Sequence, residues 1–190
     1  MQQDGMLLTP RALLSCVVRT VQVMLGRLPM NSAFALTPQG LWQAVGASAI
    51  IAFIVSVYPM TGGGIGLLAA KVTAHIISIV AMSLLFMTVL RLMGLADKEF
   101  ALLVPFIWIE NIQYLAAGLV AYMMMLGGSE QVPVMIFGPL LVWTIYWLWR
   151  TGRDQLGRGG WVASGFLILS VLVDSVVTFT LLSRIHLAAG

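Results

Sequence analysis

Long runs of apolar residues, almost free of charge, follow one another along most of the chain. Each run has about the length, near 20 residues, that an α-helix needs to cross a bilayer. Lipid offers no partner for unpaired backbone groups, so such runs must be helical to span. Short segments rich in glycine or charge separate them, as in GLADKE and RTGRDQLGRGG. The pattern predicts five transmembrane helices, at about 41–60, 72–90, 100–126, 132–149 and 161–183.

The segment before these runs has a different pattern. Residues 1–40 are expected to form a leader, an amphipathic helix from Pro10 to Leu28 and a linker that starts at Pro29. On a helical wheel the arginines of this stretch fall on one half and its Leu and Val residues on the other. We expect a helix that lies in the membrane interface and turns its basic face toward anionic headgroups. An ordinary helix packed on the bundle is the alternative. The basic face consists of Arg11, Arg19 and Arg27.

Composition supports a membrane protein. Hydrophobic residues make up 60% of the 190 positions and charged residues only 9%, against roughly 25% charged in soluble domains. We therefore expect an all-α polytopic membrane protein with one transmembrane domain, 41–190. A single cysteine, Cys16, excludes an internal disulfide. No cluster of metal ligands or catalytic motif is evident, so we expect no enzyme activity, no cofactor, no metal and no nucleic-acid partner.

Positive charge predicts the orientation. With five spans and a cytoplasmic N-terminus, only Lys71 and Arg184 lie outside. The other cationic residues lie on the cytoplasmic side, as the positive-inside rule requires. We expect a bacterial inner-membrane protein whose C-terminus lies outside. The cytoplasmic set is Arg11, Arg19, Arg27, Arg91, Lys98, Arg150, Arg153 and Arg158.

Two carboxylates interrupt the apolar runs. Glu110 lies about 15 Å into the third run and Asp174 at a similar depth in the fifth, at 1.5 Å per residue. Both have polar neighbours on or near their own helix face. A charge at this depth must face protein or water rather than lipid. The candidate intramembrane polar site comprises Glu110, Asn111, Gln113, Tyr114, Ser170, Asp174 and Thr178.

This site has two interpretations. The carboxyl groups can form an ion or proton site. Alternatively, because no Lys or Arg is expected at their depth, they take up protons and hold helices together as neutral hydrogen-bonding groups. Lys71 and His75 are expected nearer the outer end of the second run, where a lysine reaches for the interface.

Small residues recur every fourth position in the first run. Ala44, Ser48, Ala52 and Ser56 fall on one helix face. Such a stripe allows close contact between helices. We expect it to pack against a neighbour, within the chain or in another copy.

The layout also resembles a known family. A proline-containing linker leads into LWQAVGASAIIAFIVS at 41–56, a short loop with Gly94 leads into FALLVPFIWIENIQYLAAG at 100–118, and a Trp-rich fourth run ends in WLWRTGRDQLG. With five close spans, this order is similar to Yip-type membrane proteins, the bacterial relatives of the Rab-interacting Yip/Yif group. The resemblance implies a non-enzymatic scaffold or adaptor that organises other membrane proteins or copies of itself. The alternative is a small transporter or channel subunit that uses Glu110 and Asp174.

Overall fold

The computed structural model describes residues 9–57, 64–126 and 131–188, and this part of the chain is helical without any strand. The all-α prediction is therefore confirmed. The elements are α1 (Pro10–Met24), α2 (Met30–Ala33), α3 (Pro38–Val57), α4 (Gly64–Leu92), the short 3₁₀ helix η1 (Ala96–Lys98), α5 (Glu99–Met125), α6 (Gln131–Leu156) and α7 (Gly160–Ala188).

Among the described residues, four helical stretches are long and apolar enough to cross a membrane. They are Pro38–Val57, Leu68–Leu92, Ala96–Met125 and Gly160–Leu181. The protein is therefore membrane-embedded and multi-pass. Helix α6 has 26 residues, about 39 Å at 1.5 Å per residue, but it does not reach the same apolarity. The fifth span thus stays a prediction.

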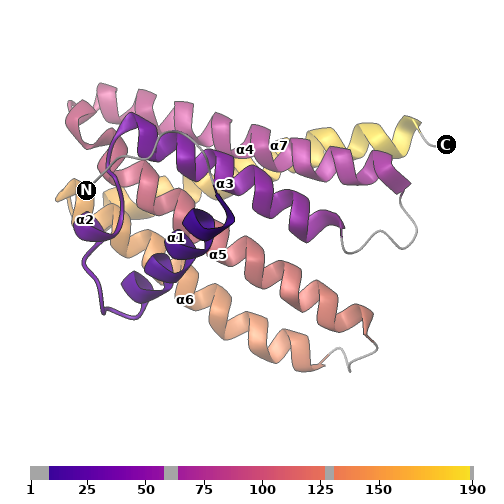
Figure 1. Ribbon diagram of the computed structural model, residues 1–190. Helices are drawn as coiled ribbons and strands as arrows, with labels where there is room; N and C mark the ends of the chain where they lie inside the picture. The colour runs from indigo at the N-terminus through magenta and orange to yellow at the C-terminus, as the bar shows by residue number, and fades with distance from the viewer. Residues whose placement is uncertain (1–8, 58–63, 127–130, 189–190) are drawn as a thin grey trace.

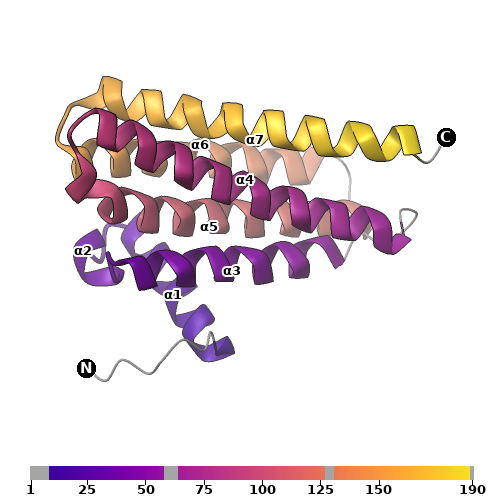
Figure 2. The same cartoon turned by 90° about the horizontal axis from the view of Figure 1, so that it is seen from above.

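The long helices form a closed ring (Figures 1 and 2). Helix α3 packs on α4 and α5, α4 packs on α7, and α6 packs on both α5 and α7. Successive helices run in opposite directions, so the α4–α5 and α6–α7 connections lie at one end of the bundle. Helices α1 and α2 lie at that end too, outside the ring, where α1 packs on α5.

The core is densest at the end of the bundle that carries α1. All eight residues at 102–109 of α5 are buried, because α5 is surrounded by α1, α3, α4 and α6. Three rings from three helices meet at this level. The centre of the Phe86 ring lies 5.2 Å from that of Phe106 and 4.7 Å from that of Phe166, and both contacts are edge-on. This aromatic cluster fastens α4, α5 and α7 together.

The predicted small-residue stripe is confirmed as a packing face. Ala44 and Ala52 of α3 are fully buried, and Ser48 and Ser56 nearly so. The outer surface is the reverse: Trp42, Leu84, Leu119, Val142 and Phe179, one from each long helix, are more than half exposed. A soluble protein rarely exposes so much apolar surface, so these side chains face lipid.

Several predicted boundaries are shifted. The second long helix starts at Gly64 rather than at 72, and its candidate membrane span at Leu68, because Lys71 continues the helix instead of preceding it. The fourth extends seven residues past Trp149 to Leu156. Arg150 and Arg153 there both pair with Asp154, so polar residues form two further helical turns. The predicted end of the first span at 60 lies outside the described residues.

The first helix ends earlier than predicted, and at a glycine. Gly26 has φ +71°. Its N–H donates to the carbonyl of Val23 at 2.8 Å, and that of Arg27 donates to Gln22 at 2.9 Å. This pair of bonds is a Schellman cap, which needs a left-handed residue. Gly26 therefore ends α1 at Met24, before Pro29 is reached.

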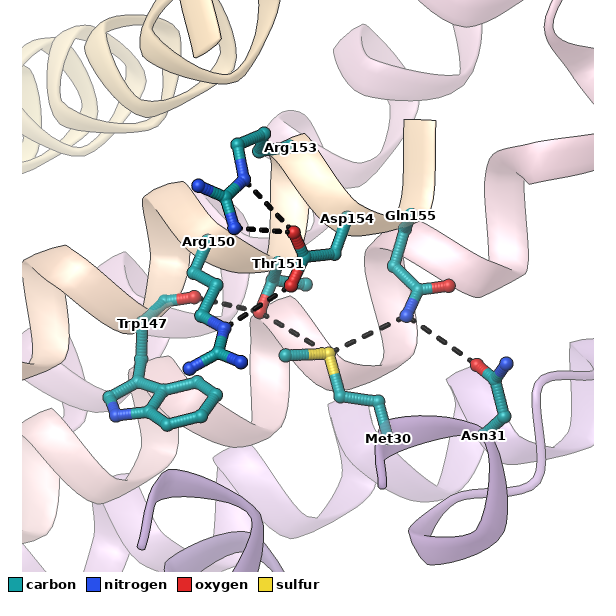
Figure 3. A network of polar contacts seen from close by, with 8 residues as sticks. All are labelled: Met30, Asn31, Trp147, Arg150, Thr151, Arg153, Asp154 and Gln155. Atoms are coloured by element: carbon teal, nitrogen blue, oxygen red, sulfur yellow. Dashed lines mark hydrogen bonds and ion pairs between the residues drawn. The ribbon is translucent and has the colours of Figure 1, made fainter. Parts of the chain in front are cut away.

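The predicted linker contains a helix of its own, α2, which is fastened to the end of α6 (Figure 3). Thr151 and Gln155 of α6 both donate to the sulfur of Met30, at 3.7 and 3.5 Å, and Gln155 also donates to Asn31 at 3.5 Å. The guanidinium of Arg150 lies 4.6 Å from the centre of the Trp147 ring. Residues 150–156, expected to be a separator, thus anchor the N-terminal segment.

Candidate intramembrane polar site

The two intramembrane carboxylates line the same cavity, although 64 positions separate them in the sequence. This cavity, the central cavity, has a volume of about 390 Å³ and lies between α4, α5, α6 and α7. The side chain of Glu110, on α5, is half-buried, and that of Asp174, on α7, is exposed. Counted from the helix ends near α1, they lie about 16 and 21 Å deep, at 1.5 Å per residue. Their shared depth follows from two helices that run in parallel.

Asp174 has a partner on a neighbouring helix. The Ser78 hydroxyl of α4 donates to Oδ1 of Asp174 at 2.9 Å. Ser78 is buried, and it also lines the central cavity. The bond fixes the carboxyl group of α7 against α4 and leaves its second oxygen for another donor.

Ser78→Ala is expected to lower the free energy of unfolding by about 0.5–1.5 kcal/mol, the usual contribution of one hydrogen bond. Ser83→Ala is the matched control, because Ser83 is equally buried on the same helix but donates only to the carbonyl of Ile79. Unfolding in mixed detergent measures both variants. Equal losses for the two would mean that the bond to Asp174 adds no stability.

His75 belongs to the site, although the sequence placed it apart from the carboxylates. Its ring stacks on that of Tyr114, with centroids 4.1 Å apart, and both rings line the central cavity. Within the described part of the chain, the Nε2 atom of His75 is buried and has no hydrogen-bond partner. Ser78 and Ser175 were missed too. Serines are common in transmembrane helices, so only their place opposite a carboxylate marks them.

A second cavity, of about 380 Å³, adjoins the first between α3, α4, α5 and α7. His75, Tyr114 and Asp174 line both. Lys71 lines the second cavity, about 10 Å along α4 from Ser78 at 1.5 Å per residue. Lys71 therefore lies on the same cavity as Asp174, but nearer the end of the bundle away from α1, and the expectation that no Lys or Arg lies at the depth of the carboxylates stays a prediction.

The remaining predicted residues divide into three groups. Gln113 and Ser170 line the central cavity with the carboxylates. Thr178 lines only the second one. Asn111 lines neither: it is fully buried, and within the described residues its amide nitrogen and oxygen have no hydrogen-bond partner. Adjacent positions point about 100° apart on a helix, so Asn111 cannot share the face of Glu110.

An aromatic cluster lies near the central cavity, on the side that carries α1. Met82 lines it, and one turn further along α4 the ring of Phe86 contacts those of Phe106 and Phe166. Helices α5 and α6 diverge from α4 and α7 toward the opposite end (Figure 1). The aromatic cluster therefore lies about one turn of α4 beyond the cavity, on the side that carries α1.

The chemistry of this site is that of two acids, an imidazole and hydroxyl groups. It can hold a cation or exchange a proton. Among the described residues no group of three or more His, Cys, Asp or Glu side chains is placed to hold a metal ion. Two carboxyls on different helices are nevertheless suited to share one positively charged ligand.

The basic residues predicted near the N-terminus are exposed. Arg11 and Arg19 of α1 and Arg27 beyond its cap all face outward. Thr20, Val23 and Met24 of the same helix are buried against the bundle, which agrees with the packed alternative. Yet Leu14, Val18 and Leu25 are 63%, 47% and 52% exposed. Helix α1 thus packs with one face and presents a second face that is both apolar and cationic.

Cys16 offers a probe of this helix. Burial raises the pKa of its thiol, and Arg19 opposes the shift only in part. Because the thiolate is the reactive form, Cys16 is expected to react with N-ethylmaleimide more slowly than the thiol that Ser15→Cys introduces into a Cys16→Ser chain, since position 15 is exposed. The difference should shrink as the pH rises toward 10. Mass spectrometry after timed labelling measures both rates, and equal rates at pH 7 would contradict a packed α1.

Comparisons with models of known families, with curated proteins and with solved structures find no match for this chain.

Proposed function

We propose that this protein is a small transporter or channel subunit in which Glu110 and Asp174 carry a proton or cation across the membrane. One observation carries the proposal: carboxyl groups from two separate helices line one cavity. We further propose that the chain crosses a bacterial inner membrane five times, with the N-terminus in the cytoplasm and the C-terminus outside.

The cost of placing carboxylates within the bilayer favours a functional role for Glu110 and Asp174 over a purely structural one. A carboxylate near the middle of a bilayer costs about 2.5–3.5 kcal/mol on insertion scales. Groups that only hold helices together pack directly against their partners. Here a hydrogen bond from Ser78 ties Asp174 to α4, and about 390 Å³ of space remains beside the two acids. That space can admit a positively charged ligand beside the two acids.

Proton uptake into reconstituted vesicles tests the proposal. Valinomycin imposes an inside-negative potential on potassium-loaded vesicles, and a trapped dye reports the internal pH. The wild-type chain is expected to take up protons well above protein-free vesicles. Glu110→Gln and Asp174→Asn should each lower this rate at least about tenfold, because a cation loses its negatively charged partner along the path.

Asp97→Asn is the matched control. Asp97 lies in η1 with its side chain 71% exposed, so the change removes one negative charge outside both cavities and should leave the rate unchanged. Size-exclusion profiles and circular dichroism establish that each variant is folded. Wild-type rates in both cavity variants, or no uptake by the wild type, would overturn the proposal.

A second candidate is the Yip-like scaffold or adaptor suggested by the family resemblance. It is supported by α1, whose exposed apolar residues Leu14 and Val18 lie beside Arg11 and Arg19. Such a surface suits anionic headgroups or a neighbouring membrane protein. Capture of the tagged chain in mild detergents should then recover a second membrane protein in stoichiometric amount. The double variant Arg11→Ser, Arg19→Ser should no longer recover it. Recovery of the bare chain in several detergents would count against the scaffold.

A further inference from the structure

The central cavity has two walls of opposite character. Helices α4, α5 and α7 contribute the polar groups described above. The wall formed by α6 is apolar throughout: Phe137, Leu141, Ile145 and Leu148 line it. Their spacing of four, four and three residues keeps them on one face of the helix. A ligand in this cavity therefore meets acids on one side and hydrocarbon on the other.

The size of the cavity excludes a bare ion as its best occupant. A volume of about 390 Å³ falls within the range of small-molecule sites, about 300–1,000 Å³. A single water occupies about 30 Å³, so one proton or one dehydrated metal ion would leave most of the space unfilled. An apolar wall would also contribute nothing to holding a hydrated ion.

The charge of the cavity indicates what the ligand must supply. Among the described residues that line it there is no Lys or Arg. Glu110 and Asp174 thus lack a cationic side chain within the cavity itself. Aromatic faces lie close by, since Tyr114 and Phe137 both line the same space, and rings of this kind attract ammonium groups.

We infer that the central cavity binds an organic cation with an apolar body, its charged nitrogen between Glu110 and Asp174 and its apolar part against the α6 wall. This inference rests on the proposed function and names the class of its cargo. Amines and quaternary ammonium compounds that carry an apolar group can contact both walls at once.

Equilibrium dialysis of the purified full-length chain in detergent tests the inference, with protein-free micelles as the blank. The probe is benzyltrimethylammonium, which carries a permanent charge and one ring. Tetramethylammonium has the same charge but no apolar body. We expect saturable binding of the benzyl compound, at least about tenfold tighter than that of tetramethylammonium, because only the former buries a ring against α6.

Two pairs of variants separate the walls. Glu110→Gln should weaken binding of the benzyl compound at least about tenfold, and Asp97→Asn should leave its affinity unchanged. Leu141→Phe narrows the apolar side and should weaken binding to a similar degree. Val142→Phe is the control one position along the helix, because Val142 is 67% exposed on the lipid side and does not line the cavity.

The comparison of the two ligands on the wild-type chain needs no variant to fold. Equal affinity for both ligands, or no saturable binding to a preparation that takes up protons normally, would overturn the inference and leave the proposed function standing. A wild-type chain that neither binds the probe nor takes up protons would overturn both. Unchanged binding in folded Glu110→Gln would contradict the placement of the charge.

Discussion

Phe86→Ala is expected to lower the free energy of unfolding by about 2–4 kcal/mol. Phe86 is fully buried and joins α4 to α5 and α7 through its contacts with Phe106 and Phe166. In a soluble core the loss would reach about 3–5 kcal/mol. Here the unfolded helices remain in lipid, which solvates a phenyl ring as well as the core does. What is lost is the contact energy around the new cavity.

Phe179→Ala is the matched control for this prediction. This substitution removes the same side chain from α7, but Phe179 is 76% exposed toward lipid. The free energy of unfolding is therefore expected to change by less than about 0.5 kcal/mol. Unfolding by sodium dodecyl sulfate in mixed micelles, followed by circular dichroism, measures both. If the two variants lost the same stability, the aromatic cluster would not be holding the bundle together.

Gly40→Ala is expected to cause the second large loss of stability, although it adds only a single methyl group. Gly40 lies in the first turn of α3. A Cβ at this position would overlap the carbonyl oxygen of Ala35, which belongs to the backbone and cannot rotate away. The link between α2 and α3 must therefore move, at a cost of about 1–3 kcal/mol typical of overpacking. We expect α2 to lose its contacts with Thr151 and Gln155 of α6 (Figure 3).

Limited trypsin digestion at Arg27, together with thermal unfolding, measures this effect. Cleavage should be faster in Gly40→Ala than in the wild type, because α2 no longer fastens the segment. Gly165→Ala is the control: a Cβ there meets nothing within 4 Å, and replacing a glycine inside a helix stabilises it by up to about 1 kcal/mol. Slower or unchanged cleavage in Gly40→Ala would refute the clash.

The long helices and their approximate positions could be predicted because lipid restricts the choice of structure. An apolar run such as 100–126 can only be a helix there, and α5 follows it to within one residue at each end. The helix ends were less predictable. Gly26 and Leu156 mark real boundaries, but a glycine or a polar stretch in a sequence does not say which hydrogen bonds it will make.

The site was predictable in part. Glu110 and Asp174 stood out because a charge within an apolar run is costly, and a similar depth followed from counting residues. Gln113 and Tyr114 were assigned by helix face and line the cavity, whereas Asn111 was included only as the next residue in the sequence and does not. His75 was interpreted as a residue near the membrane surface, since nothing in the sequence says that α4 packs on α7 and brings His75 to the same cavity as the two acids.

Sequence alone determined the membrane environment, the helical class and the presence of two acids within apolar runs, because these follow from how apolar and charged residues partition between lipid and water. The tertiary structure decided which helices are neighbours. The ring order α3–α4–α7–α6–α5 brings Ser78 to Asp174 and places an apolar face of α6 opposite the carboxylates. Helices in lipid have no strong hydrophobic preference for one partner, so close packing of particular side chains selects the order, and that selection cannot be read from one helix at a time.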